Sequence, residues 1–333
     1  MQPAAEPQTV DAPLLPGAID IHAHYVTDGY RRALADAGIS EPDGFPHVPA
    51  WDPAGAVAHM DALGIAAALL SVSSPGVHLG DDRAAARLAR ELNEAGAAAV
   101  AAHPGRFGLL ASLPLPDVPG ALAELRHAFD VLGADGVTLL TNVHGRYLSE
   151  PAYRPLWAEL DERGALVVLH PASPGGWRAT ALGRPRPMLE FPLDTTRAVI
   201  DLILAGVTQR HRRVRFVVPH LGGGLAVLAD RVHGFERAFA QAYGEPLDVI
   251  AELQRMFYDV AGAPLPRALP ALLSLVGPER VLYGSDHPFS PQPAIAAVAG
   301  DLAATDALTD AGREAMLRGN ALRLVPRLAE ADR

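Results

Sequence analysis

Short runs of apolar residues recur along the chain, and each is followed by residues with the apolar spacing of a helix. The runs are nearly continuous and lie at 18–22, 66–72, 107–113, 136–140, 166–170, 214–219, 256–260 and 281–285. Such runs are typical of strands in a parallel sheet that is covered on both faces. Between them, apolar residues repeat every three or four positions, which predicts helices at 81–102, 118–132, 151–163 and 195–205.

Eight predicted strands that alternate with helices indicate a (β/α)8 TIM barrel or a large doubly wound sheet. We favour the barrel because the strand count matches it. One barrel domain is expected over 17–328, with a flexible Pro- and Ala-rich tail at 1–16 and a short C-terminal tail at 329–333. Two long connections follow the first and fifth strands, at 25–53 and 171–192. We expect these loops over the C-terminal face, where barrel active sites lie.

The composition of the chain excludes several types of catalytic group and binding partner. The chain has no cysteine, and all 28 of its basic residues are arginine. This excludes disulfides, thiolate nucleophiles and lysine Schiff bases. The net charge of −10 indicates no basic surface for nucleic acid, and no apolar run approaches the ~20 residues of a membrane helix. The N-terminus does not resemble a signal peptide, so we expect a cytoplasmic enzyme without nucleic-acid or membrane partners.

Histidine and aspartate occur at four of the eight predicted strand ends. His22 and His24 end the first strand, and side chains two apart on a strand point the same way. His170 ends the fifth strand, His220 the sixth, and Asp286 the eighth. A buried strand rarely ends in a polar group without a partner, because an unpaired group costs ~2–7 kcal/mol. We interpret these residues as one site rather than as separate hydrogen-bonded histidines.

Together these residues resemble the metal site of the amidohydrolase superfamily. The stretches SDHPF at 285–289 and VVPHLGGG at 217–224 look like the branch of amino-carboxymuconate-semialdehyde and γ-resorcylate decarboxylases. The segment LEFPLDTTRAVIDLIL at 189–204 is similar to 6-methylsalicylate decarboxylases. The resemblance spans roughly 17–328, and its motifs are specific together but weak singly.

The resemblance implies that His22, His24 and His170 bind one divalent metal, with Asp286 as a further ligand that also relays a proton. It implies that His220 acts as the acid or base. Three imidazoles and a carboxylate suit Zn²⁺, and Mn²⁺ is the alternative because carboxylate oxygens are hard ligands. The absence of lysine agrees with a single metal, and no organic cofactor is expected.

Two reactions use the same residues. In a non-oxidative decarboxylation of a 2-hydroxybenzoate-type acid, similar to 6-methylsalicylate, Asp286 or His220 protonates the ring carbon that bears the carboxylate. In a hydrolysis, a metal-activated water attacks an amide, lactone or ester. A non-catalytic barrel is a third class. We favour the decarboxylase, and the lack of arginine at 40–63 favours a substrate with a single carboxylate.

Several further residues are candidates for substrate binding or assembly. Trp51 in the first long loop, Trp177 and Arg178 in the second, and His287 are predicted substrate contacts. His47, Asn142 and Arg146 are weaker candidates. The glycines at 222–224 suit a close backbone approach better than a phosphate site. The remaining histidines are interpreted as surface or packing residues.

Family analogy predicts a homodimer that takes a small aromatic carboxylic acid.

Overall fold

The computed structural model describes residues 13–243 and 247–332. Eight parallel strands form one sheet in which each strand pairs with the next along the chain. They are β1 (Ala18–His24), β2 (Ile65–Ser71), β3 (Phe107–Ser112), β4 (Gly136–Leu140), β7 (Leu166–His170), β8 (Arg215–Val218), β9 (Phe257–Asp259) and β10 (Val281–Leu282). Each of them coincides with a predicted apolar run.

Hydrogen bonds between the first and last strands close the sheet into a ring. The backbone N–H of Ile21 donates to Tyr283 at 3.0 Å, and that of Asp286 donates to His22 at 2.8 Å. A parallel bridge joins Ala23 to His287 at the same seam. The protein is therefore the predicted (β/α)8 barrel rather than an open doubly wound sheet.

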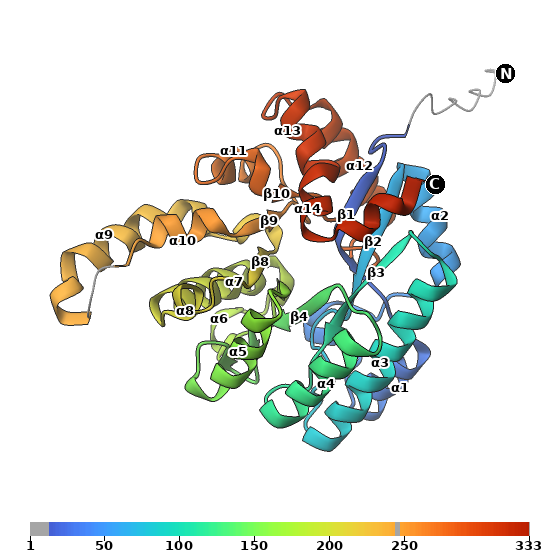
Figure 1. Cartoon of the computed structure of the whole chain (residues 1–333), viewed down its shortest axis with the longest axis horizontal. Coiled ribbons are helices and arrows are strands. Elements are labelled where there is room, and N and C mark those ends of the chain that lie inside the picture. Colours follow the sequence, from blue (N-terminus) through green and yellow to red (C-terminus); the bar gives the residue numbers. More distant parts are fainter. Residues whose placement is uncertain (1–12, 244–246, 333) are drawn as a thin grey trace.

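Helices surround the strands in chain order (Figure 1). The longer ones are α1 (Asp28–Asp36), α2 (Pro53–Leu63), α3 (Asp82–Ala102), α4 (Val118–Asp130), α5 (Arg154–Glu162), α7 (Arg186–Leu204), α9 (Leu225–Tyr243), α10 (Val249–Arg255), α11 (Ala268–Leu273) and α12 (Gln292–Ala304). Two four-residue helices, α6 (Trp177–Thr180) and α8 (Val207–Arg210), and the C-terminal α13 (Asp310–Glu314) and α14 (Asn320–Leu324) complete the layer. A two-stranded hairpin, β5 (Asn142–Val143) and β6 (Arg146–Tyr147), follows β4.

The two connections predicted as long loops both contain helix, which corrects the sequence interpretation. In the first, α1 begins after Thr27, whose side chain accepts a hydrogen bond from the Tyr30 backbone N–H and caps the helix. In the second, α7 starts at Arg186 and contains Pro192, so the helix begins nine residues before the predicted start at 195. Pro192 is tolerated because the tertiary burial of this helix outweighs one missing backbone donor.

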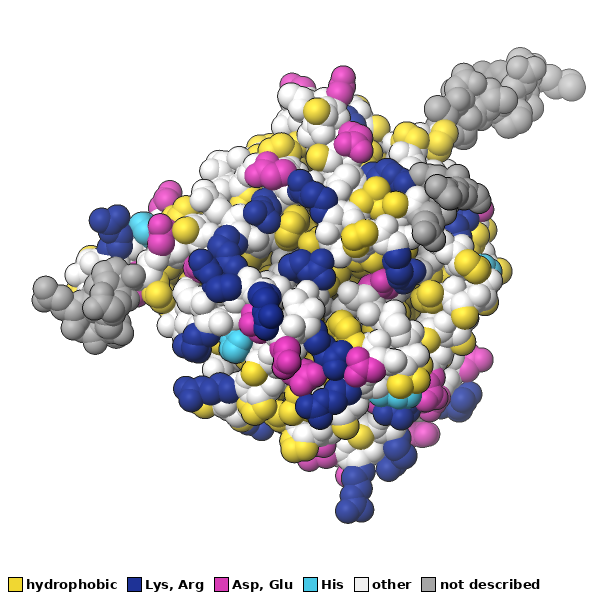
Figure 2. All heavy atoms as spheres, viewed as in Figure 1, with side chains coloured by type: hydrophobic (Ala, Val, Ile, Leu, Met, Phe, Trp, Pro, Cys, Tyr) yellow, Lys and Arg dark blue, Asp and Glu magenta, His cyan; other side chains and the backbone are white. Residues whose placement is uncertain are grey.

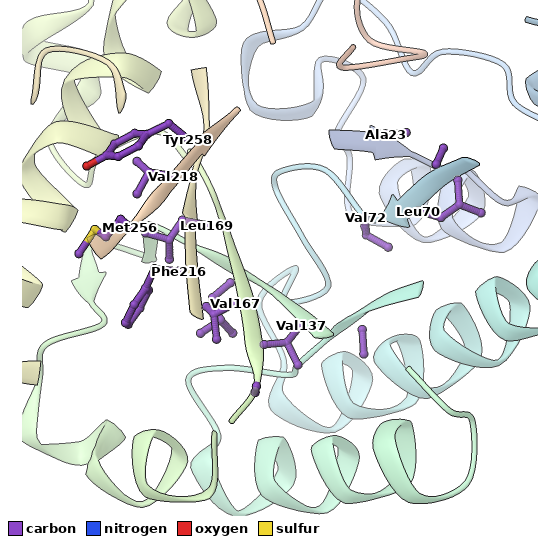
Figure 3. Close-up of a cluster of buried hydrophobic side chains, with 14 of the residues drawn as sticks. Ala23, Leu70, Val72, Val137, Val167, Leu169, Phe216, Val218, Met256 and Tyr258 are labelled. Carbon is purple, nitrogen blue, oxygen red and sulfur yellow. The ribbon is translucent and has the colours of Figure 1, made fainter. Parts of the chain in front are cut away.

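Side chains alternate between two apolar layers along the strands. In β7, Val167 and Leu169 belong to the layer between strands and helices, whereas Leu166 and Val168 fill the barrel interior. Figure 3 shows Val167 and Leu169 near Phe216 and Val218 of β8 in that outer layer. Because His170 has the same parity as Leu166 and Val168, it continues the inward face into the barrel mouth.

The chain ends pack onto the barrel where they are described. Residues 1–12 of the predicted N-terminal tail lie outside the described residues. Leu15 is fully buried, and its backbone N–H donates to Leu63 at 2.9 Å. The C-terminal segment forms a 3-10 helix at Pro326–Asp332. Arginine and acidic side chains are interspersed on the face in Figure 2. Among the described residues, no helix combines the length and apolar character needed to cross a bilayer.

Candidate functional site

Four side chains of metal-ligand type converge at the C-terminal mouth of the barrel. His22 and His24 lie on β1, His170 ends β7, and Asp286 follows β10. One nitrogen or oxygen atom of each lies within 4.8 Å of the corresponding atoms of the others. All three imidazoles are buried. The structure thus brings together the four residues that the sequence resemblance implied as metal ligands.

Hydrogen bonds to the Nδ1 atoms orient all three imidazoles. His22 Nδ1 lies 2.8 Å from Asp259 Oδ2, and His170 Nδ1 lies 2.8 Å from the Pro171 carbonyl oxygen. Both partners only accept hydrogen bonds, so each Nδ1 carries the proton. His24 Nδ1 lies 2.8 Å from Ser71 Oγ, which itself donates to the Ala23 carbonyl at 3.2 Å, so His24 Nδ1 also donates.

The Nδ1 partners therefore leave the three Nε2 atoms as the nitrogens available to a cation, although His170 Nε2 also lies 3.4 Å from Ser73 Oγ. His22 Nε2 is buried without a hydrogen-bond partner, which is costly unless another group satisfies it. His24 Nε2 lies 3.1 Å and His22 Nε2 3.7 Å from Asp286 Oδ1. The cluster offers three imidazole nitrogens and one carboxylate, and each imidazole is held in place through its other nitrogen. This is the donor arrangement of a metal site. The residues present fit one divalent cation.

The electrostatics of the cluster also suit a cation. Burial acts to lower the pKa of His22, but the carboxylates of Asp259 and Asp286 outweigh it and raise the pKa to about 9. Burial acts to raise the pKa of Asp286, but its close contact with His24 Nε2 and the charge of His22 hold it below its usual range. Burial lowers the pKa of His170 well below the ordinary value. Burial also lowers the pKa of His24, so the carboxylates favour a positive charge at His22, while the other two imidazoles remain neutral.

Asp259 is a candidate site residue that the sequence interpretation missed. It ends β9, is fully buried, and connects two of the predicted site residues through one carboxylate. Oδ2 accepts from His22 Nδ1, whereas Oδ1 accepts from the backbone N–H groups of His220 at 2.9 Å and Ala261 at 3.1 Å. The sequence could have indicated Asp259, because it is an aspartate near the end of the apolar run MFYDV and so another polar residue at a strand end.

His220 stands beside the four-residue cluster without belonging to it. Its ring centroid lies 5.0 Å from that of His22 and 6.4 Å from that of His170. The backbone at His220 and Leu221 has φ values of 54° and 57°, so the chain turns sharply after β8. Gly223 permits this turn, because a Cβ there would lie 2.3 Å from the Pro192 carbonyl oxygen. The glycine run therefore serves the close backbone approach that the sequence suggested.

A cavity of about 420 Å³ opens beside the cluster. Its polar wall is formed by His170, His220 and Asp286. Much of its apolar wall comes from Met188 and Phe191 of α7 and from Phe45, which follows the 3-10 turn Pro42–Gly44 after α1. Phe45 lies 6.1 Å from Phe191, ring centroid to centroid, and 4.9 Å from Phe289, whose own ring is 5.5 Å from His24. Neither Arg nor Lys occurs among the lining residues. The cavity suits a flat apolar ring with its polar groups toward the histidines.

The four predicted substrate contacts lie outside the lining of this cavity. Trp51 packs on Tyr25, with 5.9 Å between ring centroids. His287 stacks on His59 at 4.3 Å. Trp177 lines a neighbouring cavity and lies under the guanidinium group of Arg178. Trp51 and His287 therefore have ring contacts within the protein, and their predicted contact with substrate stays a prediction.

The weaker candidates have structural partners or lie at the surface. Asn142 donates to Asp194 at 2.8 Å, and Arg146 forms an ion pair with Glu150. His47 is exposed and lines neither cavity. Phe45, Phe191 and Phe289 were not singled out from the sequence, since isolated aromatic residues carry no spacing signal.

A metal-ligand cluster at the C-terminal mouth of a (β/α)8 barrel defines a metal-dependent barrel enzyme. The amidohydrolase family model matches residues 19–327. The chain therefore belongs to the amidohydrolase family.

Curated relatives place the chain among the decarboxylases of that family. It is 36% identical to a 6-methylsalicylic acid decarboxylase of Aspergillus aculeatus, covering 94% of this chain and 97% of the relative. It is 35% identical to a second enzyme of that name from Penicillium expansum, covering 93% and 96%. A γ-resorcylate decarboxylase of Rhodococcus jostii is 30% identical, covering 69% and 75%.

Solved structures agree with this fold. A crystal structure of an amidohydrolase II has a TM-score of 0.88 at 35% identity, covering 93% of this chain and all of that one. A dihydroxybenzoic acid decarboxylase from Polaromonas, with bound manganese and 2-nitroresorcinol, has a TM-score of 0.80 at 23% identity, covering 93% and 97%.

Proposed function

We propose that this decarboxylase removes the carboxylate of a 2-hydroxybenzoate-type acid similar to 6-methylsalicylate, in a metal-dependent and non-oxidative reaction. One observation carries the proposal: three Nε2 atoms and a carboxylate face one point, directly beside a cavity with aromatic and aliphatic walls. The names of two curated relatives, at 36% and 35% identity, support the same substrate class.

The proposed cofactor is one divalent cation held by His22, His24, His170 and Asp286. Three imidazoles and one carboxylate favour Zn²⁺, and Mn²⁺ is the alternative because oxygen ligands suit it and the Polaromonas structure contains it. When bound, the cation supplies positive charge to the carboxylate and 2-hydroxyl oxygens of the substrate. No organic cofactor is part of the proposal.

His220 and Asp286 are the proposed proton carriers, because both line the cavity beside the ligand cluster. One of them donates a proton to the ring carbon that bears the carboxylate, and a C–H bond forms there. The bond from that carbon to the carboxylate then breaks, its electron pair restores the aromatic ring, and carbon dioxide leaves. Water returns the proton to the side chain, and a phenol remains as the product.

The cavity wall supports a particular kind of ring. Phe45, Met188 and Phe191 offer apolar surface that suits an alkyl substituent better than a second hydroxyl group. The absence of Arg among the lining residues supports a single carboxylate rather than a dicarboxylate. Substrate contacts from Arg178, Trp177, Trp51 and His287 stay predictions.

The direct test is a turnover assay with purified, metal-loaded protein on 6-methylsalicylate, salicylate and 2,6-dihydroxybenzoate. We expect carbon dioxide and the matching phenol, with the highest kcat/KM for the methyl-substituted acid. Amide, ester and lactone substrates belong in the same panel. Hydrolysis of those compounds without decarboxylation of any acid would refute the proposal and favour the hydrolase alternative.

We also propose a homodimer in the cytoplasm. Exposed large apolar side chains concentrate on two helices, with Met188, Leu189, Leu193 and Leu204 on α7 and Val227, Leu228, Phe235 and Phe239 on α9. An apolar surface of this kind supports a protein interface. Light scattering of the purified protein tests it, and a monomer at micromolar concentration would refute it.

A further inference from the structure

A second cavity of about 400 Å³ lies at the same end of the barrel and contains a histidine pair that the proposed reaction does not use. The loops after β2, β4 and β7 line it. His78 comes from the first of these loops and His144 from the second, and His78 Nδ1 lies 2.8 Å from His144 Nε2. On its other side, His78 Nε2 lies 2.8 Å from the carboxylate of Asp82.

The contact between His78 and Asp82 repeats the arrangement seen in the barrel mouth. A carboxylate that accepts from one imidazole nitrogen sets the proton there and leaves the lone pair on the other nitrogen, as Asp259 does for His22. Here the carboxylate of Asp82 places the His78 lone pair on Nδ1, which faces His144 at 2.8 Å and also accepts a long hydrogen bond from the Gly80 backbone N–H at 3.4 Å. The His78 side chain is only 10% exposed, so its orientation is held by packing as well as by Asp82.

His144 is not explained by the local fold. His144 and Gly145 form the two-residue turn between β5 and β6, with φ values of 52° and 80°. A turn with two positive φ angles favours Asn, Asp or Gly, so the conformation of the turn does not explain why a histidine occupies this position.

We propose that His78 and His144 bind a second divalent transition-metal ion, distinct from the ion of the barrel mouth. Two nitrogens 2.8 Å apart subtend roughly 90° at an ion held ~2.0–2.1 Å from each, which suits square-planar or octahedral coordination. The cavity leaves room for water or a small ligand to complete the coordination. Imidazole pairs select Zn²⁺, Ni²⁺ or Cu²⁺ over Mg²⁺ and Ca²⁺. The ion would join the loop after β2 to the loop after β4.

The test counts zinc ions on the full chain. Protein stripped with a chelator is dialysed against increasing free Zn²⁺, and bound zinc is measured by elemental analysis. We expect two ions per chain for the unmodified protein, with the second bound more weakly. His144→Asn should bind one, and Asn suits the positive φ of this turn, so the variant is expected to fold. His47→Asn removes an exposed histidine outside both cavities and should still bind two.

A second variant tests the role of the carboxylate. Asp82→Asn should raise the dissociation constant of the second ion about tenfold, while the first ion is unaffected. Excess Zn²⁺ should raise the Tm of the unmodified protein further than that of His144→Asn when the first site of each is already filled. One ion per chain in the unmodified protein, or two in His144→Asn, would overturn the proposal and leave a simple hydrogen bond between the two histidines.

Discussion

Replacing Asp259 by asparagine isolates the contribution of the carboxylate behind the metal cluster. Oδ1 of Asp259 accepts from two backbone N–H groups, those of His220 and Ala261. An asparagine that keeps these bonds must place its NH₂ group where Oδ2 now faces His22 Nδ1, at 2.8 Å. Two donors then face each other, and His22 must move its proton to Nε2 or rotate its ring. In either case Nε2 no longer offers a lone pair to the ion.

The expected loss follows from that change of tautomer. Removing the outer partner of a metal-bound histidine typically lowers metal affinity 10- to 100-fold, which corresponds to about 1.4–2.7 kcal/mol. The assay is a competition titration of Zn²⁺ against a chelator of known affinity, with bound zinc confirmed by elemental analysis. Activity measured at saturating metal should recover in part.

A matched control separates this effect from a general loss of stability. Asp135 is also a buried carboxylate, and it pairs with Arg327 and accepts from the Leu109 backbone N–H, away from the metal cluster. Asp135→Asn should destabilise the protein without changing its zinc affinity. Equal zinc affinities for Asp259→Asn, Asp135→Asn and the unmodified protein would show that Asp259 does not control the His22 tautomer.

Three further changes have distinct expected results. His220→Asn should retain the metal, since Asn tolerates the positive φ there, and should lower kcat by roughly 10²–10⁴-fold; loss of the metal would contradict the proton-transfer role. His170→Ala should lower bound metal and activity in parallel, by elemental analysis and assay. Burial lowers the pKa of His287 from 6.5 to about 4, so its contribution to stability is present above pH 6.5 and lost as the pH falls to about 4. Denaturant titrations should therefore show a shallower acid decline for His287→Gln, and identical declines would refute this.

Most of the fold was predictable because strands and helices leave periodic patterns in local sequence. All eight apolar runs are barrel strands, and Asp81 caps α3 as its position before the helix suggests. The helices inside the two long connections were not predicted, because Gly and Pro there are typical of loops. Burial of Tyr30 and Leu34 stabilises α1 from outside the segment, and such long-range contacts are invisible in a local pattern.

The site was predictable where polar residues interrupt strand ends, and unpredictable where partners come from distant segments. His22, His24, His170 and Asp286 follow buried runs, so their convergence follows from the barrel. Asp259 was interpreted only as part of a buried strand, because the sequence does not show which imidazole its carboxylate contacts. The apolar cavity wall depends on how α7 and the turn after α1 pack over the mouth, which the spacing of residues does not encode.

The sequence by itself therefore determined the barrel, the end at which its site lies, and the type of ligands that meet there. These properties depend on strand parity and connection order, which neighbouring residues specify. Only the tertiary structure decided which nitrogen of each histidine is free, which carboxylate orients it, and which side chains face the cavity. Those outcomes depend on distances of a few ångströms between segments far apart in the chain, set by how the closed ring and its outer helices pack together.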